Sequence, residues 1–260
     1  MFGFLLSRRW LLFGLFVVVL AAVCWRLGVW QFDRLEERRT DNAIIEQNLD
    51  AQPVPADAVM NVSRPLPEQQ QWRRVIATGS YQTTDETLVR YQTRDGRPGV
   101  TVLTPLRTEG GETLLVDRGW MAVTNDPTAP VHPPAPAPGR VTVTGWAVPD
   151  QGGDPDEITP LHGEVRLISS RGFTEITDRS LLQGYLIARN ETPPPERPLV
   201  ASVPPALDSG PHFFYGLQWW FFAALAVGGF GYFGYLEARD RRKSRETRHQ
   251  LDTTSAPQGM

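Results

Sequence analysis

A histidine that opens an apolar, aromatic-rich stretch is the residue in this sequence best placed to do chemistry. In helical geometry His212 shares a face with Trp219 and lies beside Tyr215 and Gly216. An ionisable residue at the edge of such a stretch points to function. A neutral imidazole beside flat aromatic side chains can ligate haem iron while the rings cover the macrocycle. The alternative is that His212 is an interfacial anchor in an aromatic belt.

The sequence lacks the patterns of the commonest catalytic and cofactor sites. It contains no G-x-S-x-G, H-E-x-x-H, C-x-x-C-H or phosphate-loop pattern. Its single cysteine, Cys24, allows neither an intramolecular disulfide nor a cysteine metal cluster. The glycines of 229–234 match a dinucleotide fingerprint only by letters, because no strand precedes them. We therefore expect a protein that is not an enzyme and that has no nucleic-acid partner.

The first long apolar run predicts a transmembrane helix over residues 10–30. Every residue from Trp10 to Trp25 is apolar or small, and the run continues past Arg26. Its length is close to the ~20 residues that a helix needs to cross hydrocarbon. The competing interpretation is a cleavable signal peptide, with Arg8 and Arg9 as its basic region. The run exceeds the usual apolar core of about 7–15 residues, which favours an uncleaved anchor.

A second apolar run predicts a transmembrane helix over residues 212–236, and the basic residues fix the orientation. Its start is rich in Phe, Trp and Tyr, as expected at an interface, and its end is followed by a cluster of arginines and Lys243. Basic residues lie on the cytoplasmic side of membrane proteins. We therefore expect residues 1–9 and 237–260 in the cytoplasm and residues 31–211 outside.

The expected location is the inner membrane of a bacterial cell, with the lipid bilayer as a partner. No Ser-rich, acidic-poor amphipathic leader precedes the first run, which disfavours a mitochondrial membrane. Lys243 is the only lysine among 26 basic residues, a bias typical of GC-rich bacteria such as actinobacteria. Within the second run, Ala224, Gly228 and Gly231 fall on one helical face and predict close helix packing. The alternative is a bias toward glycine without a packing role.

The segment between the two spans has the pattern of a β domain. Short apolar or alternating runs, bounded by Gly, Pro and Asp, predict strands at Arg73–Tyr81, Thr87–Gln92, Gly99–Arg107, Thr113–Trp120, Val141–Val148, Glu164–Ile168 and Gly184–Arg189. Short strands with little helix predict a mostly antiparallel sheet, closed as a barrel or folded as a sandwich. The expected fold class is therefore membrane α+β, with two transmembrane helices flanking one extracytoplasmic β domain.

Three further segments of this region are predictable. Residues 36–49 are polar with periodic Ile and Leu, and are expected to continue the first helix beyond the membrane. The proline-rich segments 126–139 and 193–211 cannot hold a strand ladder and are expected to be loops or spacers. The similar segments 75–79 and 141–145 could be a repeat; the favoured interpretation is two strands that each end in a turn glycine.

Four short motifs in order resemble the surfeit locus protein 1 family of cytochrome c oxidase assembly factors. They are Gly28-x-Trp30-Gln31-x-x-Arg34-Leu35, Thr104-Pro105-Leu106, Leu115-Val116-Asp117-Arg118-Gly119-Trp120 and His212-x-x-Tyr215-x-x-Gln218-Trp219. Their order and spacing match the family from the first span to the second. The sequence departs from the family pattern at Asp117, where asparagine is usual, and at Gly216, where alanine is frequent.

The resemblance implies a role in maturing the haem-containing catalytic subunit of an aa3-type cytochrome c oxidase. It implies haem a as the cofactor, His212 as a ligand of the haem iron, the oxidase catalytic subunit as a partner, and haem a synthase as a further candidate partner. The other motif residues become candidate cofactor-binding or docking positions: Trp30, Gln31, Arg34, Arg118, Tyr215, Gln218 and Trp219.

Arg34 and Arg118 also have a physical rationale, because a guanidinium can pair bidentately with a haem propionate. The alternatives are an interfacial flank for Arg34 and a strand-end salt bridge for Arg118. A different function is also compatible with the sequence: a haem-independent membrane scaffold that stabilises oxidase subunits during assembly. An extracytoplasmic sensor is disfavoured because the basic tail carries no signalling domain.

Overall fold

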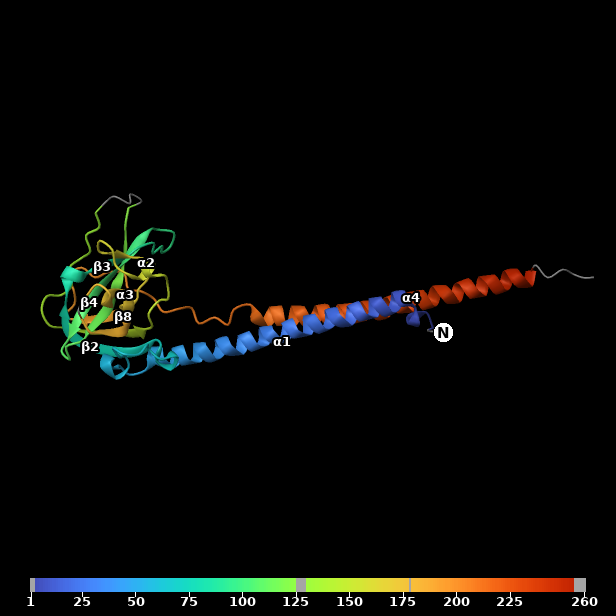
Figure 1. Ribbon diagram of the computed structural model, residues 1–260, viewed down its shortest axis with the longest axis horizontal. Helices are drawn as coiled ribbons and strands as arrows, with labels where there is room; N and C mark the ends of the chain where they lie inside the picture. The colour runs from blue at the N-terminus through green and yellow to red at the C-terminus, as the bar shows by residue number, and fades with distance from the viewer. Residues whose placement is uncertain (1–2, 125–129, 178, 255–260) are drawn as a thin grey trace, which may run out of the picture. The chain divides into compact units, whose positions relative to one another are not determined.

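A computed structural model describes residues 3–124, 130–177 and 179–254 of the chain (Figure 1). The chain divides into two compact units. One unit contains the two ends, up to Asp41 and from Asp208, and consists mainly of two long helices. The other unit, Asn42–Leu207, contains the strands.

Two helices of 43 residues each, α1 (Arg8–Asp50) and α4 (His212–Thr254), dominate the first unit. Both are long and apolar enough to cross a membrane, and they contain the predicted spans 10–30 and 212–236. The predicted continuation of the first helix over 36–49 is confirmed, since α1 ends only at Asp50. Its end lies just before Gln52-Pro53, where the proline disfavours helix in the preceding residue. A 3₁₀ turn, η1 (Gly3–Leu6), precedes α1.

Small residues of one helix meet large aromatic residues of the other where α1 and α4 lie side by side (Figure 1). Gly28 faces the indole of Trp220, and a Cβ at Gly28 would lie 2.2 Å from Trp220 Nε1. Gly216 faces the ring of Phe32 in the same way, with 2.7 Å to the nearest ring carbon. Glycine at these positions therefore allows the helices to approach closely.

The predicted packing face of Ala224, Gly228 and Gly231 does not carry this contact. A Cβ at Gly228 or Gly231 would have nothing within 4 Å among the described residues. The face is therefore open within this chain, and its use by another helix stays a prediction.

The second unit contains all the predicted strands and one that the sequence pattern did not show. The observed strands are β1 (Val54–Pro55), β2 (Arg73–Tyr81), β3 (Thr87–Val89), β4 (Gly99–Thr108), β5 (Thr113–Ala122), β6 (Val141–Val148), β7 (Glu164–Val165) and β8 (Leu181–Thr192). Short helical turns connect them: η2 (Ala56–Ala58), η3 (Glu68–Gln70), η4 (Thr83–Asp85), α2 (Pro155–Ile158) and α3 (Ser170–Thr174). The strand β1 escaped prediction because two residues give no period.

The strands form one sheet in the order β1-β2-β6-β8-β5-β4-β3-β7, and a further pairing of β2 with β4 closes it. The ring β2-β6-β8-β5-β4 is therefore a barrel, which decides between the barrel and the sandwich. The sheet is mixed: β8 runs parallel to β5, and the short edge strands β1 and β7 also pair in parallel. The chain between β5 and β8 includes the whole of β6, and this crossover allows the parallel pairing, because a parallel neighbour cannot be joined by a hairpin.

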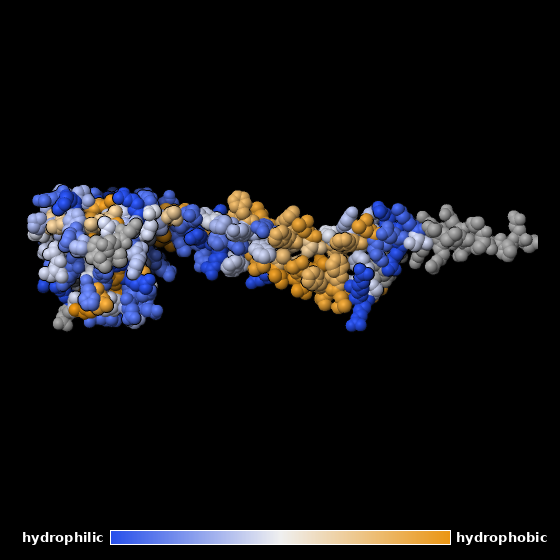
Figure 2. Space-filling model, turned by 90° about the horizontal axis from the view of Figure 1, so that it is seen from above, coloured by the Kyte–Doolittle hydropathy of each residue, from blue (hydrophilic) through white to orange (hydrophobic). Residues whose placement is uncertain are grey.

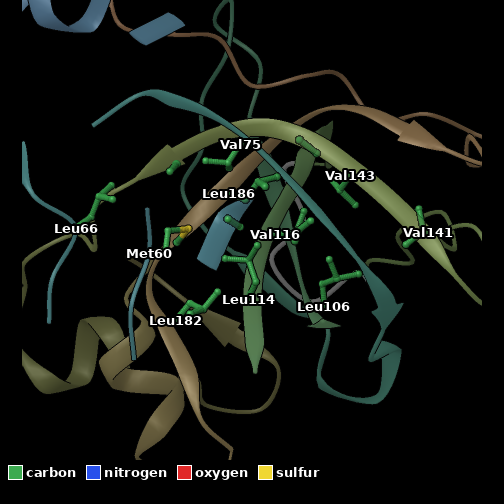
Figure 3. Packing of buried hydrophobic residues seen from close by; sticks show 14 residues of the cluster. Met60, Leu66, Val75, Leu106, Leu114, Val116, Val141, Val143, Leu182 and Leu186 are labelled. Atoms are coloured by element: carbon green, nitrogen blue, oxygen red, sulfur yellow. The ribbon is translucent and has the colours of Figure 1, made fainter. Parts of the chain in front are cut away.

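The barrel interior is a continuous apolar core (Figure 3). Side chains from β2, β4, β5, β6 and β8 point toward one another in it, and Met60 and Leu66 fill it from the loop before β2. Burial alternates along β2 and β6, whereas eight consecutive residues of β4 and of β5 are buried. β4 and β5 are therefore covered on both faces.

The two similar segments 75–79 and 141–145 pair with each other, Val75 opposite Gly145 and Gly79 opposite Val141. The expectation that their glycines end the strands is wrong, because both glycines lie inside a strand. A Cβ at Gly79 would lie 2.1 Å from the carbonyl oxygen of Arg107, and one at Gly145 would lie 2.0 Å from that of Ile187. These glycines therefore permit close backbone approach where the barrel bends.

The proline-rich segments are largely irregular, as expected. Residues 130–139 hold no helix or strand, and the predicted loop residues 126–129 lie outside the described part of the chain. The segment 193–211 makes one exception. Val200 and Trp120 exchange two backbone hydrogen bonds, with N···O distances of 2.7 and 2.9 Å, within a part of the segment that contains no proline.

Candidate functional site

His212 and Gln31 meet between the two long helices. The Nδ1 atom of His212 lies 2.8 Å from the side-chain oxygen Oε1 of Gln31, and both side chains are half-buried. Each belongs to one of the motifs quoted above. The structure therefore brings together two of the predicted site residues that are separated by 181 positions in the sequence.

Aromatic side chains close to this pair in both helices pack together and hold the two helices in register. The indole of Trp220 stacks on that of Trp25, with ring centroids 5.1 Å apart and planes at 14°. Phe32, next to Gln31, packs against both Trp220 and Phe213 at 4.8 and 6.1 Å. His212 is the first residue of α4, so its position is fixed by this packing through less than three helical turns.

The hydrogen bond to Gln31 selects a tautomer of the imidazole. With the amide oxygen as acceptor, Nδ1 of His212 carries the proton and donates it to Gln31. The lone pair of Nε2 then remains available as a ligand. Metal-ligating histidines characteristically donate their other ring N–H to such a partner, which also fixes the orientation of the ring.

The structure adds Arg38 to the surroundings of His212. The ring atoms Cδ2 and Nε2 of His212 lie 3.3 and 3.5 Å from the position of a Cβ at Gly210, and Nη1 of Arg38 lies 3.2 Å from the same point. Arg38 also approaches Asp208 at 3.9 Å, in an exposed pair. Sequence reasoning missed Arg38, although it follows Gln31 by seven residues and therefore lies on the same helical face.

Trp30 and Arg34 form a separate exposed group on α1. The guanidinium carbon of Arg34 lies 6.0 Å from the ring centroid of Trp30, and its Nη1 pairs with Glu37 at 2.6 Å. Trp30 is 49% exposed and Tyr215 on α4 is 48% exposed. Both rings thus present apolar surface that nothing in the helix pair covers.

The remaining residues predicted on α4 differ in exposure. Gln218 is exposed, whereas Trp219 is half-buried and packs edge-on against Phe222 with 6.0 Å between ring centroids. Neither is shown in contact with His212. His212 and Trp219 are therefore on the same face of α4 by their spacing, but their side chains are not shown to touch.

Arg118 lies in the barrel unit, where its charge is already paired. Its side chain is 2% exposed, and Nη1 lies 2.9 Å from Glu86 Oε2. Its Nη2 donates to the carbonyl oxygen of Pro134 at 2.9 Å, and its guanidinium stacks over the ring of Tyr81 at 5.6 Å. The salt-bridge alternative raised from the sequence therefore describes its contacts, and a role toward a haem propionate stays a prediction.

Polar groups around Arg118 form one buried network. Glu86 also accepts a hydrogen bond from Thr104 at 2.7 Å, and the Tyr81 hydroxyl donates to Glu191 at 3.0 Å. Burial raises the pKa of Tyr81 above its ordinary value, and the charge of Glu191 adds to the effect. Burial also raises the pKa of the Glu191 carboxyl. These directions are those of groups held in a low-dielectric interior.

Asp117, where the sequence departs from the family pattern, lines a polar cavity of about 260 Å³ in the barrel unit. The residue is 4% exposed, and its carboxylate accepts a hydrogen bond from the Gly119 N–H at 2.8 Å. Burial raises its pKa to about 6, against the lowering effects of Ser202, the Gly119 N–H and Arg94. Tyr185 lines the same cavity.

The helix unit contains the side-chain chemistries that a haem group needs. A haem brings four nitrogens of its own and needs from the protein an axial ligand, a flat apolar surface and partners for its propionates. The Nε2 atom of His212, the exposed rings of Trp30 and Tyr215, and the guanidinium of Arg38 have these chemistries. Within the described residues, no cluster of three or more His, Cys, Asp and Glu side chains forms a metal site of another kind.

The structural class of this protein is a closed mixed β-barrel with a long helix before it and another after it. Each of the two helices is long and apolar enough to cross a membrane. The profile of the SURF1 family matches residues 18–224, which include most of α1, all the strands and the start of α4. The chain belongs to the SURF1 family. This confirms the family resemblance seen in its motifs.

Curated relatives agree with this membership. Uncharacterized SURF1-like proteins of Mycobacterium tuberculosis and Mycobacterium bovis are 32% identical over 247 residues, which cover 94% of this chain and 90% of those proteins. The cytochrome oxidase assembly protein SHY1 of Saccharomyces cerevisiae is 30% identical over 122 residues, which cover 45% of this chain and 31% of that protein.

Proposed function

We propose that this protein is an assembly factor for an aa3-type cytochrome c oxidase, and that it binds haem a and assists its insertion into the catalytic subunit. Membership of the SURF1 family and the similarity to a yeast protein named as a cytochrome oxidase assembly protein support the assembly role. The oxidase catalytic subunit is the expected partner, and haem a synthase is a candidate donor.

The hydrogen bond between Gln31 and His212 is the single observation that best supports haem binding. It leaves one imidazole nitrogen free as a ligand and fixes the plane of the ring. Trp30 and Tyr215 would cover the macrocycle, and Arg38 would pair with a propionate. Arg34 is a second candidate for that pairing, although Glu37 already neutralises it.

When bound, haem a would be carried as cargo with its iron held by one protein nitrogen. The chain's own residues bind and orient it: His212 supplies the ligand, and Gln31 holds the proton of His212 at Nδ1. Binding through one protein nitrogen would be compatible with later release of the haem to the oxidase subunit.

Purification from a host that makes haem a tests this proposal directly. The visible spectrum and the extracted pigment of the full chain should show haem a, and His212→Ala should accumulate in the membrane with most of the haem lost. A gene deletion should lower the haem content of the oxidase without stopping synthesis of its subunits. Fully haem-loaded oxidase in the deletion strain would refute the assembly role.

A haem-independent scaffold is the second candidate, and the open face at Gly228 and Gly231 favours it. A helix of an oxidase subunit could pack there, since no described residue of this chain does. His212→Ala separates the two functions: a scaffold would still support oxidase assembly in the deletion strain, whereas a haem carrier would not.

The orientation in the membrane is part of the proposal. Basic residues at both ends of the chain place the termini in the cytoplasm and the barrel outside. Reporter fusions after residue 245 should be active only in the cytoplasm, and fusions near residue 150 only outside. An exported C-terminus would refute the two-span arrangement.

A further inference from the structure

A groove of about 410 Å³ opens between the 3₁₀ turn η1 and the later turns of α4. Leu5 forms one wall, and more than three turns of α4 form the other wall. The α4 residues that line it are Phe230, Gly231, Gly234, Tyr235, Ala238, Arg239 and Arg242. All these residues belong to the helix unit, far along α4 from His212.

The groove has one apolar and one cationic end. Phe230, Gly231 and Gly234 give it an apolar floor, and glycine leaves room there because a Cβ at Gly231 would have nothing within 4 Å. Arg239 and Arg242 are three residues apart and lie on adjacent positions of one helical face at the other end. The neighbouring Arg241 differs, since its Nε pairs with Glu237 at 2.9 Å.

This change of polarity coincides with the end of the candidate membrane span. The apolar run of α4 ends at Leu236, and hydrophilic residues follow it (Figure 2). In an inserted helix the apolar floor would lie at the depth of acyl chains and the two arginines at the depth of lipid phosphates. The groove therefore has the polarity profile of one lipid leaflet.

We propose that this groove binds an anionic phospholipid, with its phosphate on Arg239 and Arg242 and an acyl chain along Gly231 and Gly234. A guanidinium matches a phosphate with two parallel charge-assisted hydrogen bonds. Basic pockets beside transmembrane helices on the cytoplasmic side are typical sites for such headgroups. The site requires insertion of α4 in a bilayer and is independent of haem binding.

The two ends together favour a lipid over other occupants. Free phosphate would use only the arginine end and leave the apolar floor exposed. A protein helix would cover the apolar floor, but it would need acidic residues to meet two arginines at the membrane boundary. An anionic lipid satisfies both ends with one molecule and no further assumption.

Native mass spectrometry of the full-length protein in detergent tests the proposal, with phosphatidylglycerol and phosphatidylcholine of identical acyl chains as probes. Phosphatidylglycerol should bind more tightly than phosphatidylcholine. Arg239→Gln/Arg242→Gln should weaken phosphatidylglycerol binding about thirtyfold. At ~1.4 kcal/mol per tenfold this equals the ~2 kcal/mol that two arginines contribute near an anionic surface.

Matched variants separate a specific groove from a general attraction to the basic tail. Arg241→Gln removes the same charge outside the groove and should have little effect, as should Gly228→Leu. Gly231→Leu should fill the apolar floor and lower binding, although both glycines have open space around their Cβ positions. The proposal would be overturned if the two lipids bound equally well. It would also be overturned if Arg241→Gln weakened binding as much as Arg239→Gln or Arg242→Gln, or if inorganic phosphate bound without the lipid.

Discussion

The amide oxygen of Gln31 on α1 lies 2.8 Å from Nδ1 of His212 on α4. This bond joins the motif that ends the first predicted span to the motif that begins the second. Because an amide oxygen only accepts, it fixes the proton of a neutral imidazole on Nδ1. Gln31 is therefore a positioning residue for the proposed iron ligand.

Loss of this bond is expected to weaken haem retention. Gln31→Leu removes the acceptor at similar size, and partners of this kind typically change metal affinity by about 10–100-fold. Haem should dissociate faster from Gln31→Leu, and its absorption maxima should shift. Gln31→Glu restores an acceptor and should recover binding with a lower midpoint potential, because a carboxylate makes the imidazole a stronger donor.

An exposed glutamine on the same helix, Gln47, provides the control for this experiment. Gln47→Leu should leave both the spectrum and the midpoint potential unchanged. If Gln31→Leu accumulates normally and keeps the wild-type spectrum and potential, Gln31 does not position the ligand.

Helix packing at Gly28 should be sensitive to a single methyl group. A Cβ at Gly28 would lie 2.2 Å from Trp220 Nε1, so Gly28→Ala must displace the indole from its stack on Trp25. Overpacking of this kind typically costs about 1–3 kcal/mol. Thermal unfolding in detergent, followed by tryptophan fluorescence, should show a lower midpoint.

Gly228→Ala is the matched control, because both substitutions gain the same helix propensity of about 1 kcal/mol. No described atom lies within 4 Å of the Cβ position at Gly228, so this variant should be as stable as the wild type or more so. Equal midpoints for the two variants would mean that α1 and α4 do not pack through Gly28.

Local patterns in the sequence were sufficient to predict most of the fold. The period-two strands β2 and β6 were placed with their observed bounds, because alternate residues face a single core. The barrel closure could not be predicted, since it depends on contacts of β2 with both β4 and β6. The role of Gly79 and Gly145 followed from that closure, and the sequence alone suggested turns instead.

The site was predictable where a motif carries the residues and not where geometry selects them. His212 stood out because it is a titratable residue at an apolar boundary, and Gln31 because it lies in a quoted motif. Their contact required the pairing of helices that are far apart in the sequence. Arg38 was missed because its approach to His212 depends on the turn at Gly210, for which the sequence gives no periodic signal.

Arg118 is expected to act on stability and not directly on haem. Its removal would leave the part-buried Glu86 without its cation, and the cost should lie below the ~3–5 kcal/mol typical of a fully buried pair. Arg118→Met should therefore lower the urea midpoint of the full chain, while the haem content per folded molecule stays near the wild-type value. Arg140→Met, at a fully exposed pair with Glu109, should change stability little. Normal stability with loss of haem would instead support the propionate role of Arg118.

The buried carboxyl of Asp117 should make the stability of the barrel depend on pH. Burial raises its pKa from 3.8 to about 6, so between these values the folded state binds more protons than the unfolded state. Stability from this group therefore falls as pH rises through that window. The full difference above pH 6 is about 3 kcal/mol, at ~1.4 kcal/mol per pKa unit.

Replacement of Asp117 by asparagine, the residue usual in the family, should remove this cost. Asparagine keeps a side-chain oxygen for the Gly119 N–H and carries no charge to bury. Asp117→Asn is expected to raise the urea midpoint of the full chain at pH 7 and to reduce the decline between pH 5 and 7. Some decline should remain, because burial also raises the pKa of Glu191.

Asp95→Asn, at an exposed turn with a φ of 50°, tests the general effect of one lost carboxylate, since asparagine also tolerates this backbone conformation. If Asp117→Asn and Asp95→Asn gave the same pH profile, burial of Asp117 would not be the cause.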